Sequence, residues 1–149
     1  MDARVDRNAL RFNQACIVLF TVLAFVLGAG VGKWLVLAVS AVMLAGTAYA
    51  PASLFKGVYR HVFVRLGILR PNVVPEDPAP HQFAQGLGGT FLLASFIALL
   101  VGAAVVGWVL AWMVVALALI NLLFGFCAGC FLYFQLERLG LIPRSAEVR

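Results

Sequence analysis

Two cysteines, Cys127 and Cys130, form a C-x-x-C pair within the stretch NLLFGFCAGCFLYFQ. In a soluble protein this spacing is typical of a redox site or of half a zinc site. Here the pair falls in an apolar run that is long enough to cross a bilayer. On a helix the spacing puts both sulfurs on one face, about 60° apart, so an internal disulfide or a metal can use them. The alternative is that both cysteines pack as small hydrophobic residues.

The third cysteine, Cys16, is expected at a similar membrane depth. At about 1.5 Å per helical residue, counted from Gln135 and Arg11, Cys130 and Cys16 lie roughly 7 Å below the inner interface. On the same count Cys127 lies roughly 12 Å deep. We therefore predict Cys127 and Cys130 as the candidate thiol pair and Cys16 as a candidate third thiol. A structural disulfide is not expected on the reducing, cytoplasmic side of a membrane.

The expected surroundings of the pair disfavour a reactive thiolate. In one continuous helix the pair lies toward the C-terminal end, where the helix dipole opposes negative charge. Thioredoxin-like sites are different, because their reactive cysteine lies at a helix N-terminus. Burial in lipid also disfavours the charged form. A reactive pair would then need a cationic neighbour, for which the candidates are Arg11, Arg138, Lys56 and protonated His61.

The composition identifies the class of protein that holds these thiols. Of 149 residues, 64% are hydrophobic and only 11% are charged, which leaves too little polar surface for a soluble domain. The apolar runs lack the alternation of a membrane β-barrel. The sequence thus predicts an all-α membrane protein, with no cleavable signal peptide at its start.

Four apolar segments have the roughly 20 residues that a transmembrane helix needs. Short turns at 31–33 and 109–111 join them in pairs, so we expect two helical hairpins. The predicted spans are 12–31, 34–50, 86–108 and 112–135. They make one four-span domain, 1–149, consisting of hairpin 12–50, connection 51–85, hairpin 86–135 and C-terminal tail 136–149.

The positive charges predict the orientation of these spans. Ten of the 11 Lys and Arg residues lie before the first span, in the connection or after the last span, and only Lys33 lies in a short turn. By the positive-inside rule, both termini and the connection are cytoplasmic. We therefore expect a multi-pass protein of a bacterial inner (plasma) membrane. Nucleic acid is not an expected partner, because each basic cluster adjoins a span.

The connection has two halves of different character. In PASLFKGVYRHVFVRLG, apolar and basic residues are interleaved, which predicts a cytoplasmic interfacial helix on anionic headgroups. In RPNVVPEDPAPHQ, four prolines predict extended chain without a helix.

Two further patterns concern how the helices meet. RFNQACIVLF and QFAQGLGGTF share two Phe and one Gln at a constant offset, and a duplication would make Gln14 and Gln85 face each other at the inner surface. Gly125 and Gly129 form a G-x-x-x-G pattern that predicts close helix contact. Asn121 is expected near the middle of the membrane, where it needs a hydrogen-bond partner.

With these residues assembled, the chain resembles a bacterial membrane protein family catalogued as domain of unknown function 4395. The resemblance rests on VDRNALRFNQ, PEDPAPHQFAQ and GFCAGCFLY, in that order, over nearly the whole chain. It implies a small membrane protein without an assigned activity, whose genes tend to lie near thioredoxin-like and sulfurtransferase genes. This association favours thiol or sulfur chemistry for Cys127 and Cys130.

Our leading hypothesis is a thiol-redox or sulfur-handling protein that works through Cys127 and Cys130 with a thioredoxin-like or sulfurtransferase partner. One alternative is a non-catalytic small subunit of a larger membrane complex or homo-oligomer. Another is a soft-metal site or transporter that uses the thiols with His61 or His81. A transport path is less favoured, because no predicted span carries an acidic residue. No organic cofactor is predicted, and whether the chain is an enzyme stays open.

Overall fold

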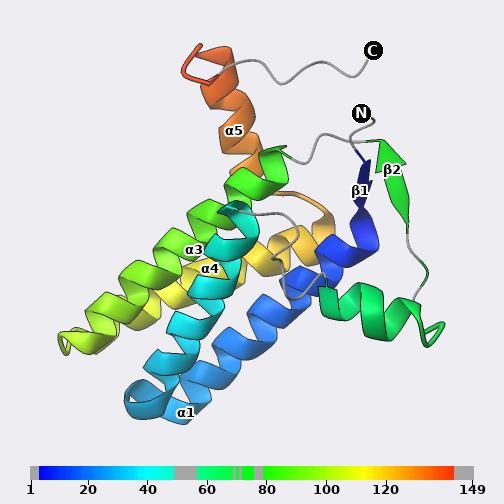
Figure 1. The fold of residues 1–149 in the computed structure, drawn as a ribbon. Coiled ribbons are helices and arrows are strands. Elements are labelled where there is room, and N and C mark those ends of the chain that lie inside the picture. The colour runs from blue at the N-terminus through cyan, green and yellow to red at the C-terminus, as the bar shows by residue number, and fades with distance from the viewer. Residues whose placement is uncertain (1–3, 49–56, 69, 71, 76–78, 143–149) are drawn as a thin grey trace.

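The long apolar runs of the sequence form helices that pack against one another (Figure 1). The computed structural model describes residues 4–48, 57–68, 70, 72–75 and 79–142. Its α-helices are α1 (Arg7–Ala48), α3 (Ala79–Leu100), α4 (Ala104–Phe124) and α5 (Ala128–Arg138). Within the described residues, α1, α3 and α4 are each long and apolar enough to cross a membrane. The predicted class, a helical membrane protein, is thereby supported.

Helix α1 consists of two arms that meet at Gly28. This glycine has φ 78° and ψ 174°, a conformation outside the helical region that reverses the chain. The two arms run side by side in Figure 1, and Gly32 packs directly against the backbone of Ala24. The turn therefore begins before the predicted 31–33. Lys33 suggested a polar turn, whereas the backbone reverses at a glycine inside the apolar run.

The second turn also lies earlier than predicted. Helix α3 ends at Leu100, and Gly102 has φ 88°, so the chain reverses here and not at 109–111. Helix α3 also begins at Ala79 and not at residue 86. Pro80 is accommodated because the first turn of a helix does not need its N–H group. The extended chain that the prolines predicted is therefore wrong for 79–82.

Small residues bring the helices together around α3, which contacts α1, α4 and α5. The Ser40 hydroxyl donates a hydrogen bond to the Gly89 carbonyl (2.8 Å), and the Ser95 hydroxyl donates to the Gly107 carbonyl (2.7 Å). Such bonds satisfy buried hydroxyls where lipid offers no partner. The buried core around them includes Ile17, Ala24, Val36, Val39, Met43, Leu92, Leu99, Ala111 and Val114. Many large apolar side chains face outward, as a lipid-facing surface requires; they include Leu19, Val26, Val31, Val105, Val109 and Leu123.

A two-stranded antiparallel sheet ties the N-terminus to the connection. Strand β1 (Arg4–Asp6) pairs with β2 (Val73–Pro75), an element that the all-helical prediction lacked. The Asp6 carboxylate accepts hydrogen bonds from the backbone N–H of Asn8 (3.0 Å) and Asn72 (3.1 Å). The same Asp6 oxygen therefore caps the start of α1 and holds the connection in place at Asn72.

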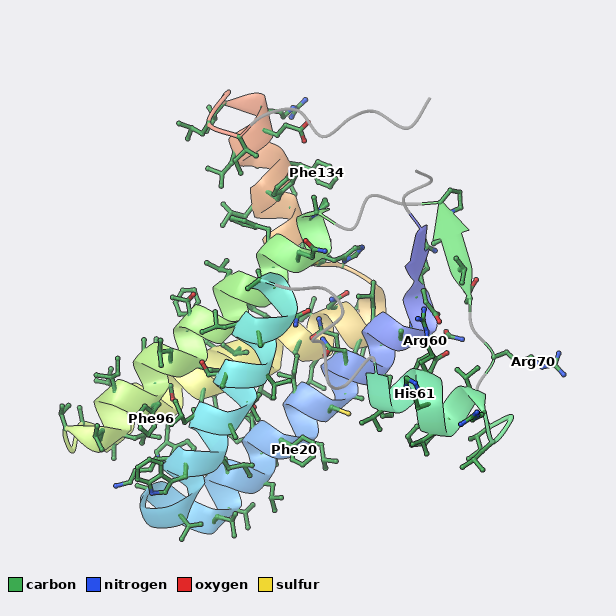
Figure 2. All side chains as sticks on the ribbon, viewed as in Figure 1. Phe20, Arg60, His61, Arg70, Phe96 and Phe134 are labelled. Carbon is green, nitrogen blue, oxygen red and sulfur yellow. A yellow bond between two sulfur atoms is a disulfide. The ribbon has the colours of Figure 1, made fainter. Side chains whose placement is uncertain are left out.

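The predicted interfacial helix is represented by the short π-helix η2 (Tyr59–Val64), and its first residues, 51–56, lie outside the described part of the chain. Phe12 of α1 packs on the rings of Tyr59 and Phe63, with centroids 5.7 and 4.8 Å apart. Burial raises the pKa of the Tyr59 hydroxyl, and the Asp6 carboxylate raises it further. Arg60 and His61 lie on η2, and Arg70 lies farther along the connection (Figure 2).

Candidate functional site

The C-x-x-C pair lies at a break between two helices, and not inside one continuous helix. Helix α4 ends at Phe124, and Gly125 then adopts the left-handed conformation (φ 69°) while its N–H bonds the Asn121 carbonyl (2.9 Å). This is the usual way in which a glycine ends a helix. Helix α5 begins at Ala128, so the predicted span 112–135 is wrong.

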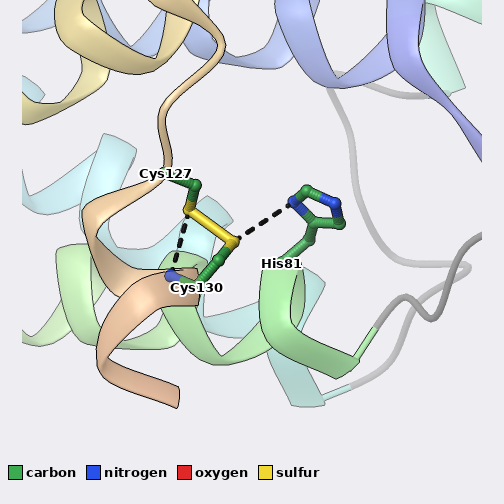
Figure 3. The surroundings of a disulfide bond; sticks show 3 residues. All are labelled: His81, Cys127 and Cys130. Atoms are coloured by element: carbon green, nitrogen blue, oxygen red, sulfur yellow. Dashed lines mark hydrogen bonds between the residues drawn. A yellow bond between two sulfur atoms is a disulfide. The ribbon is translucent and has the colours of Figure 1, made fainter. Parts of the chain in front are cut away.

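Cys127 occupies the N-cap position of α5. Its backbone is extended (φ −94°, ψ 105°), and its sulfur accepts a hydrogen bond from the backbone N–H of Cys130 (3.2 Å; Figure 3). At this end of a helix the dipole and the free N–H groups favour negative charge. The expectation that the dipole opposes a thiolate is therefore wrong. The local arrangement is the one in which helix N-termini activate cysteines.

The two sulfurs are joined in a disulfide, with Cα atoms 5.1 Å apart. That separation lies within the usual range of about 4.4–6.8 Å for bonded cysteines. A structural disulfide was not expected from the sequence, and the two sulfurs nevertheless lie in bonding contact. Cys130 is the more buried partner, with 9% of its surface exposed, while Cys127 is half-buried.

His81, in the first turn of α3, completes the surroundings of the pair. Its Nδ1 atom lies 3.6 Å from the Cys130 sulfur (Figure 3). The imidazole can accept the proton of a reduced Cys130 thiol. The ligand atoms of His81, Cys127 and Cys130 all lie within 4.8 Å of one another, so the reduced pair with His81 can also hold a soft metal ion. The other histidine named from the sequence, His61 on η2, has its Nδ1 atom 3.0 Å from the Gly57 carbonyl oxygen, which precedes that helix.

A cavity of about 270 Å³ opens beside the pair, where residues of α1, α3 and α4 meet the start of α5. Cys127 forms part of its wall. Its polar lining comprises Arg7, Arg11, Asn13, Gln14, His81, Gln85 and Asn121. Gln14 and Gln85, which a duplication would make face each other at the inner surface, both line this cavity. The Gln85 amide donates a hydrogen bond to the Met43 carbonyl (3.1 Å), and the duplication itself stays a prediction.

The cavity distinguishes among the cations proposed from the sequence. Arg11 lines the cavity together with Cys127, whereas Arg138 lies in the last turn of α5, at the opposite end of that helix. Lys56 lies outside the described residues. Cys16 is a free, half-buried cysteine on α1 and is absent from the described cavity lining. The structure thus brings Cys127 and Cys130 together and places Arg11 on the wall of the cavity that Cys127 also lines, whereas Cys16 is absent from that described lining.

Two contributors to the site were not predicted as such. Asn13 is 3% exposed and lines the cavity, yet nothing in its local sequence marks it as more than a helix residue. Arg7 also lines the cavity and was interpreted only as a topology signal. The helix break did have a signal in the sequence. Gly125 can end one helix as its C-terminal cap, and Cys127, two residues later, can then be the N-cap of the next helix.

Gly129 sets the distance between α5 and α3. Gly125 lies outside α5, so the pair does not form the predicted G-x-x-x-G face on one helix. A Cβ atom added at Gly129 would lie 2.5 Å from the Cβ and 2.7 Å from the Cα of Ala84. Close packing at this single glycine therefore fixes the start of α5, and with it the cysteine pair, against α3.

Gly129→Ala should lower the free energy of unfolding by about 1–3 kcal/mol, the usual cost of overpacking a tight contact. The measurement is the Tm of the purified protein in detergent. Adding Ala84→Gly should recover only part of the loss, because it removes the Ala84 Cβ while the Cα stays 2.7 Å from the new methyl group. Phe131→Ala, at an exposed position of the same helix, is the control and should have a smaller effect. A double variant as unstable as the sum of the two single changes would contradict this contact.

Comparisons with known proteins identify one family. The profile of the family described as Domain of unknown function (DUF4395) matches residues 5–138. No curated protein and no solved structure matches the chain significantly.

Proposed function

Since the chain belongs to the DUF4395 family, whose description names no activity, we propose a function from the site alone: dithiol–disulfide exchange at the membrane through Cys127 and Cys130. The observation that carries the proposal is the cap of α5. The Cys127 sulfur accepts the Cys130 N–H at a helix N-terminus, beside a cavity that Arg11 also lines. Each of these features favours a thiolate over a neutral thiol.

The two cysteines have different roles in this proposal. The half-buried Cys127 thiolate attacks the disulfide of a partner, which forms a mixed disulfide and releases one partner thiolate. The Cys130 thiol then loses its proton to His81 and attacks the Cys127 sulfur. This second step releases the other partner thiolate and leaves Cys127 and Cys130 joined. The partner gains two electrons and the pair loses two, and the same steps in reverse oxidise the partner.

A soluble thioredoxin-like or sulfurtransferase protein is the proposed partner. Such a protein needs access from water, so the orientation of the helices matters. In our arrangement the two arms of α1, α3 and α4 cross the membrane, and the turns at Gly28 and Gly102 lie on the side away from the cytoplasm. The cavity, η2 and both termini then face the cytoplasm, which agrees with the distribution of Lys and Arg.

Reporter fusions test this orientation. A reporter that works only in the cytoplasm should be active when fused after Arg149, and one that works only outside should be active when inserted at the Gly28 turn. The physical reason is the excess of arginine beside the cytoplasmic ends of the helices. Outside activity of the C-terminal fusion would contradict the arrangement and remove the thiol pair from the cytoplasm.

Mass spectrometry of the intact protein, purified without reductant, tests the dithiol proposal. We expect a population that is two hydrogens lighter than the fully reduced chain, with the bond mapped to Cys127 and Cys130 and with Cys16 free. Glutathione disulfide should convert the reduced protein to this form, and dithiothreitol should reverse the change. Cys130→Ser should instead accumulate a glutathione adduct on Cys127. A pair that stays reduced and unmodified in all these reactions would contradict the proposal.

A second candidate function, soft-metal binding, rests on the cluster of His81, Cys127 and Cys130. The reduced thiols with the imidazole supply three of the four ligands that a zinc ion prefers. The same intact-mass experiment, repeated under native conditions with reductant present, distinguishes the two functions. A bound zinc or copper ion that His81→Ala removes would favour the metal site.

A further inference from the structure

We propose that the cavity beside Cys127 binds a quinone, which exchanges two electrons with the Cys127–Cys130 pair. This inference rests on the proposed dithiol function and adds the chemical class of a second substrate. A dithiol that is oxidised or reduced repeatedly needs a further electron carrier, and the cavity adjoins the sulfur that would meet it.

The size and the lining of the cavity suit one aromatic ring. Its volume, about 270 Å³, is at the lower limit of small-molecule pockets, which is about 300 Å³, and is too small for a flavin or a dinucleotide. Polar groups line one part of it, as described above. The remainder is apolar, lined by Ile17, Met43, Phe91, Val114, Leu117 and Leu122. A quinone combines an apolar ring with oxygen atoms at its ends, and so matches both parts.

Asn13 supplies the second, independent observation. Its side chain is 3% exposed and lines the cavity, and its Oδ1 atom has no hydrogen-bond partner in the described part of the chain. A buried acceptor without a donor costs about 1–3 kcal/mol, so a ligand that supplies the donor is favoured. The hydroxyl of a hydroquinone is such a donor. An anionic sulfur compound does not supply this donor, because its negative charge would face the Asn13 side-chain oxygen.

Arg11 stabilises the charge that builds up during reduction. No described lining residue is acidic, whereas Arg7 and Arg11 both line the cavity. As electrons reach a quinone, its oxygen atoms become more negative, and a nearby guanidinium favours that state over the neutral ring.

The apolar part of the cavity wall also reaches the surface that faces the lipid. Leu117 lines the cavity and is 41% exposed on the outer surface of α4, which gives a lipid-soluble ligand an apolar approach.

The proposed step is balanced in electrons and protons. The reduced pair loses two electrons and two protons as the sulfur–sulfur bond between Cys127 and Cys130 forms. The quinone takes both electrons and two protons and becomes the hydroquinone. His81 accepts the proton of Cys130, since its Nδ1 lies 3.6 Å from that sulfur.

The test uses the full-length reduced protein in detergent, without oxygen, and a short-tailed ubiquinone, decylubiquinone. Loss of quinone absorbance should be saturable, with one quinone reduced per disulfide formed, and Cys127→Ser should abolish it. Decylubiquinol, the product, should inhibit the reaction, and Asn13→Leu should raise its half-inhibiting concentration about fivefold, the value of one lost hydrogen bond from the hydroquinone hydroxyl. The same variant should keep or raise the Tm without quinone, because it removes a buried unpaired acceptor.

Thr21→Val is the matched control. The Thr21 hydroxyl is also buried on the same arm of α1 and has no hydrogen-bond partner among the described residues, and Thr21 does not appear in the described cavity lining. The half-inhibiting decylubiquinol concentration of this variant should change less than about twofold, because no bond to the ligand is lost. Equal shifts in both variants, or a rate that does not saturate, would overturn the quinone site. Exchange with glutathione disulfide is measured in parallel. If that exchange occurs and quinone reduction does not, the quinone inference fails while the dithiol function stands.

Discussion

Cys127 of the reduced protein should react with iodoacetamide at neutral pH about tenfold or more faster than Cys16, because its thiolate is stabilised at a helix N-terminus. The Cys127 sulfur accepts the Cys130 N–H and lies beside a cavity that Arg11 lines. Cys16 lies within α1 and is absent from the described lining of that cavity. The expected difference in alkylation rate therefore has an electrostatic cause, in addition to any difference in how readily the reagent reaches each sulfur.

The measurement is a time course of alkylation in the Cys130→Ser variant, followed by peptide mass spectrometry. This variant keeps the backbone N–H of residue 130 and leaves only Cys127 and Cys16 to react. Arg11→Gln in the same background should slow Cys127 severalfold and leave Cys16 unchanged, whereas Arg138→Gln should change neither. If Cys127 reacted no faster than Cys16, the cap of α5 would have no chemical role. The interpretation of the cysteines as packing residues, in a small subunit of a larger complex, would then be the better one.

The sequence was sufficient to predict the features that depend on composition. Long apolar runs predicted membrane-spanning helices, and the C-x-x-C spacing predicted that Cys127 and Cys130 meet. Arg11 was among the cations proposed for the pair, and it lines the same cavity. The first two inferences hold because they need only the identity of the residues and the short spacing of the pair, and a role for Arg11 stays a prediction.

The position of the turns could not be predicted in the same way. Turns in soluble proteins are marked by polar residues, but Gly28 and Gly102 lie inside apolar sequence and reverse the chain through their backbone conformation alone. The predicted turns at 31–33 and 109–111 lie some residues away from the actual turns at Gly28 and Gly102. The short sheet was missed because it depends on Asp6 meeting Asn72 across the connection, a contact between residues far apart in sequence.

The most consequential difference concerns Gly125. Its apolar neighbours predicted a continuous helix through the cysteines, and its spacing from Gly129 suggested a packing face. Both interpretations are reasonable for a glycine in a membrane helix, since packing and chain termination use the same residue. The left-handed backbone at Gly125 reverses the electrostatic conclusion, because the pair moves from the C-terminal end of one helix to the N-terminus of the next.

Gly125→Val tests this reversal directly and should have a large effect on the thiols. A Cβ atom added at Gly125 meets nothing within 4 Å, so the first effect of the substitution is on the backbone. The left-handed conformation costs an ordinary residue about 1–2 kcal/mol, and β-branched residues adopt it least readily. Valine should therefore favour continuation of α4 through the cysteines. The Cys127 thiolate would then lose its cap, and its alkylation rate should fall to about that of Cys16.

Gly125→Asn is the matched control, because asparagine tolerates the left-handed conformation at helix ends and also adds a side chain. Its alkylation rate at Cys127 should stay within about twofold of the parent, since the cap is retained. Both variants are measured in the Cys130→Ser background, with Cys16 as the internal standard and circular dichroism to verify folding. If valine and asparagine slowed Cys127 equally, side-chain bulk would be the cause. If neither did, the thiol would owe its reactivity to Arg11 and not to the N-terminus of α5.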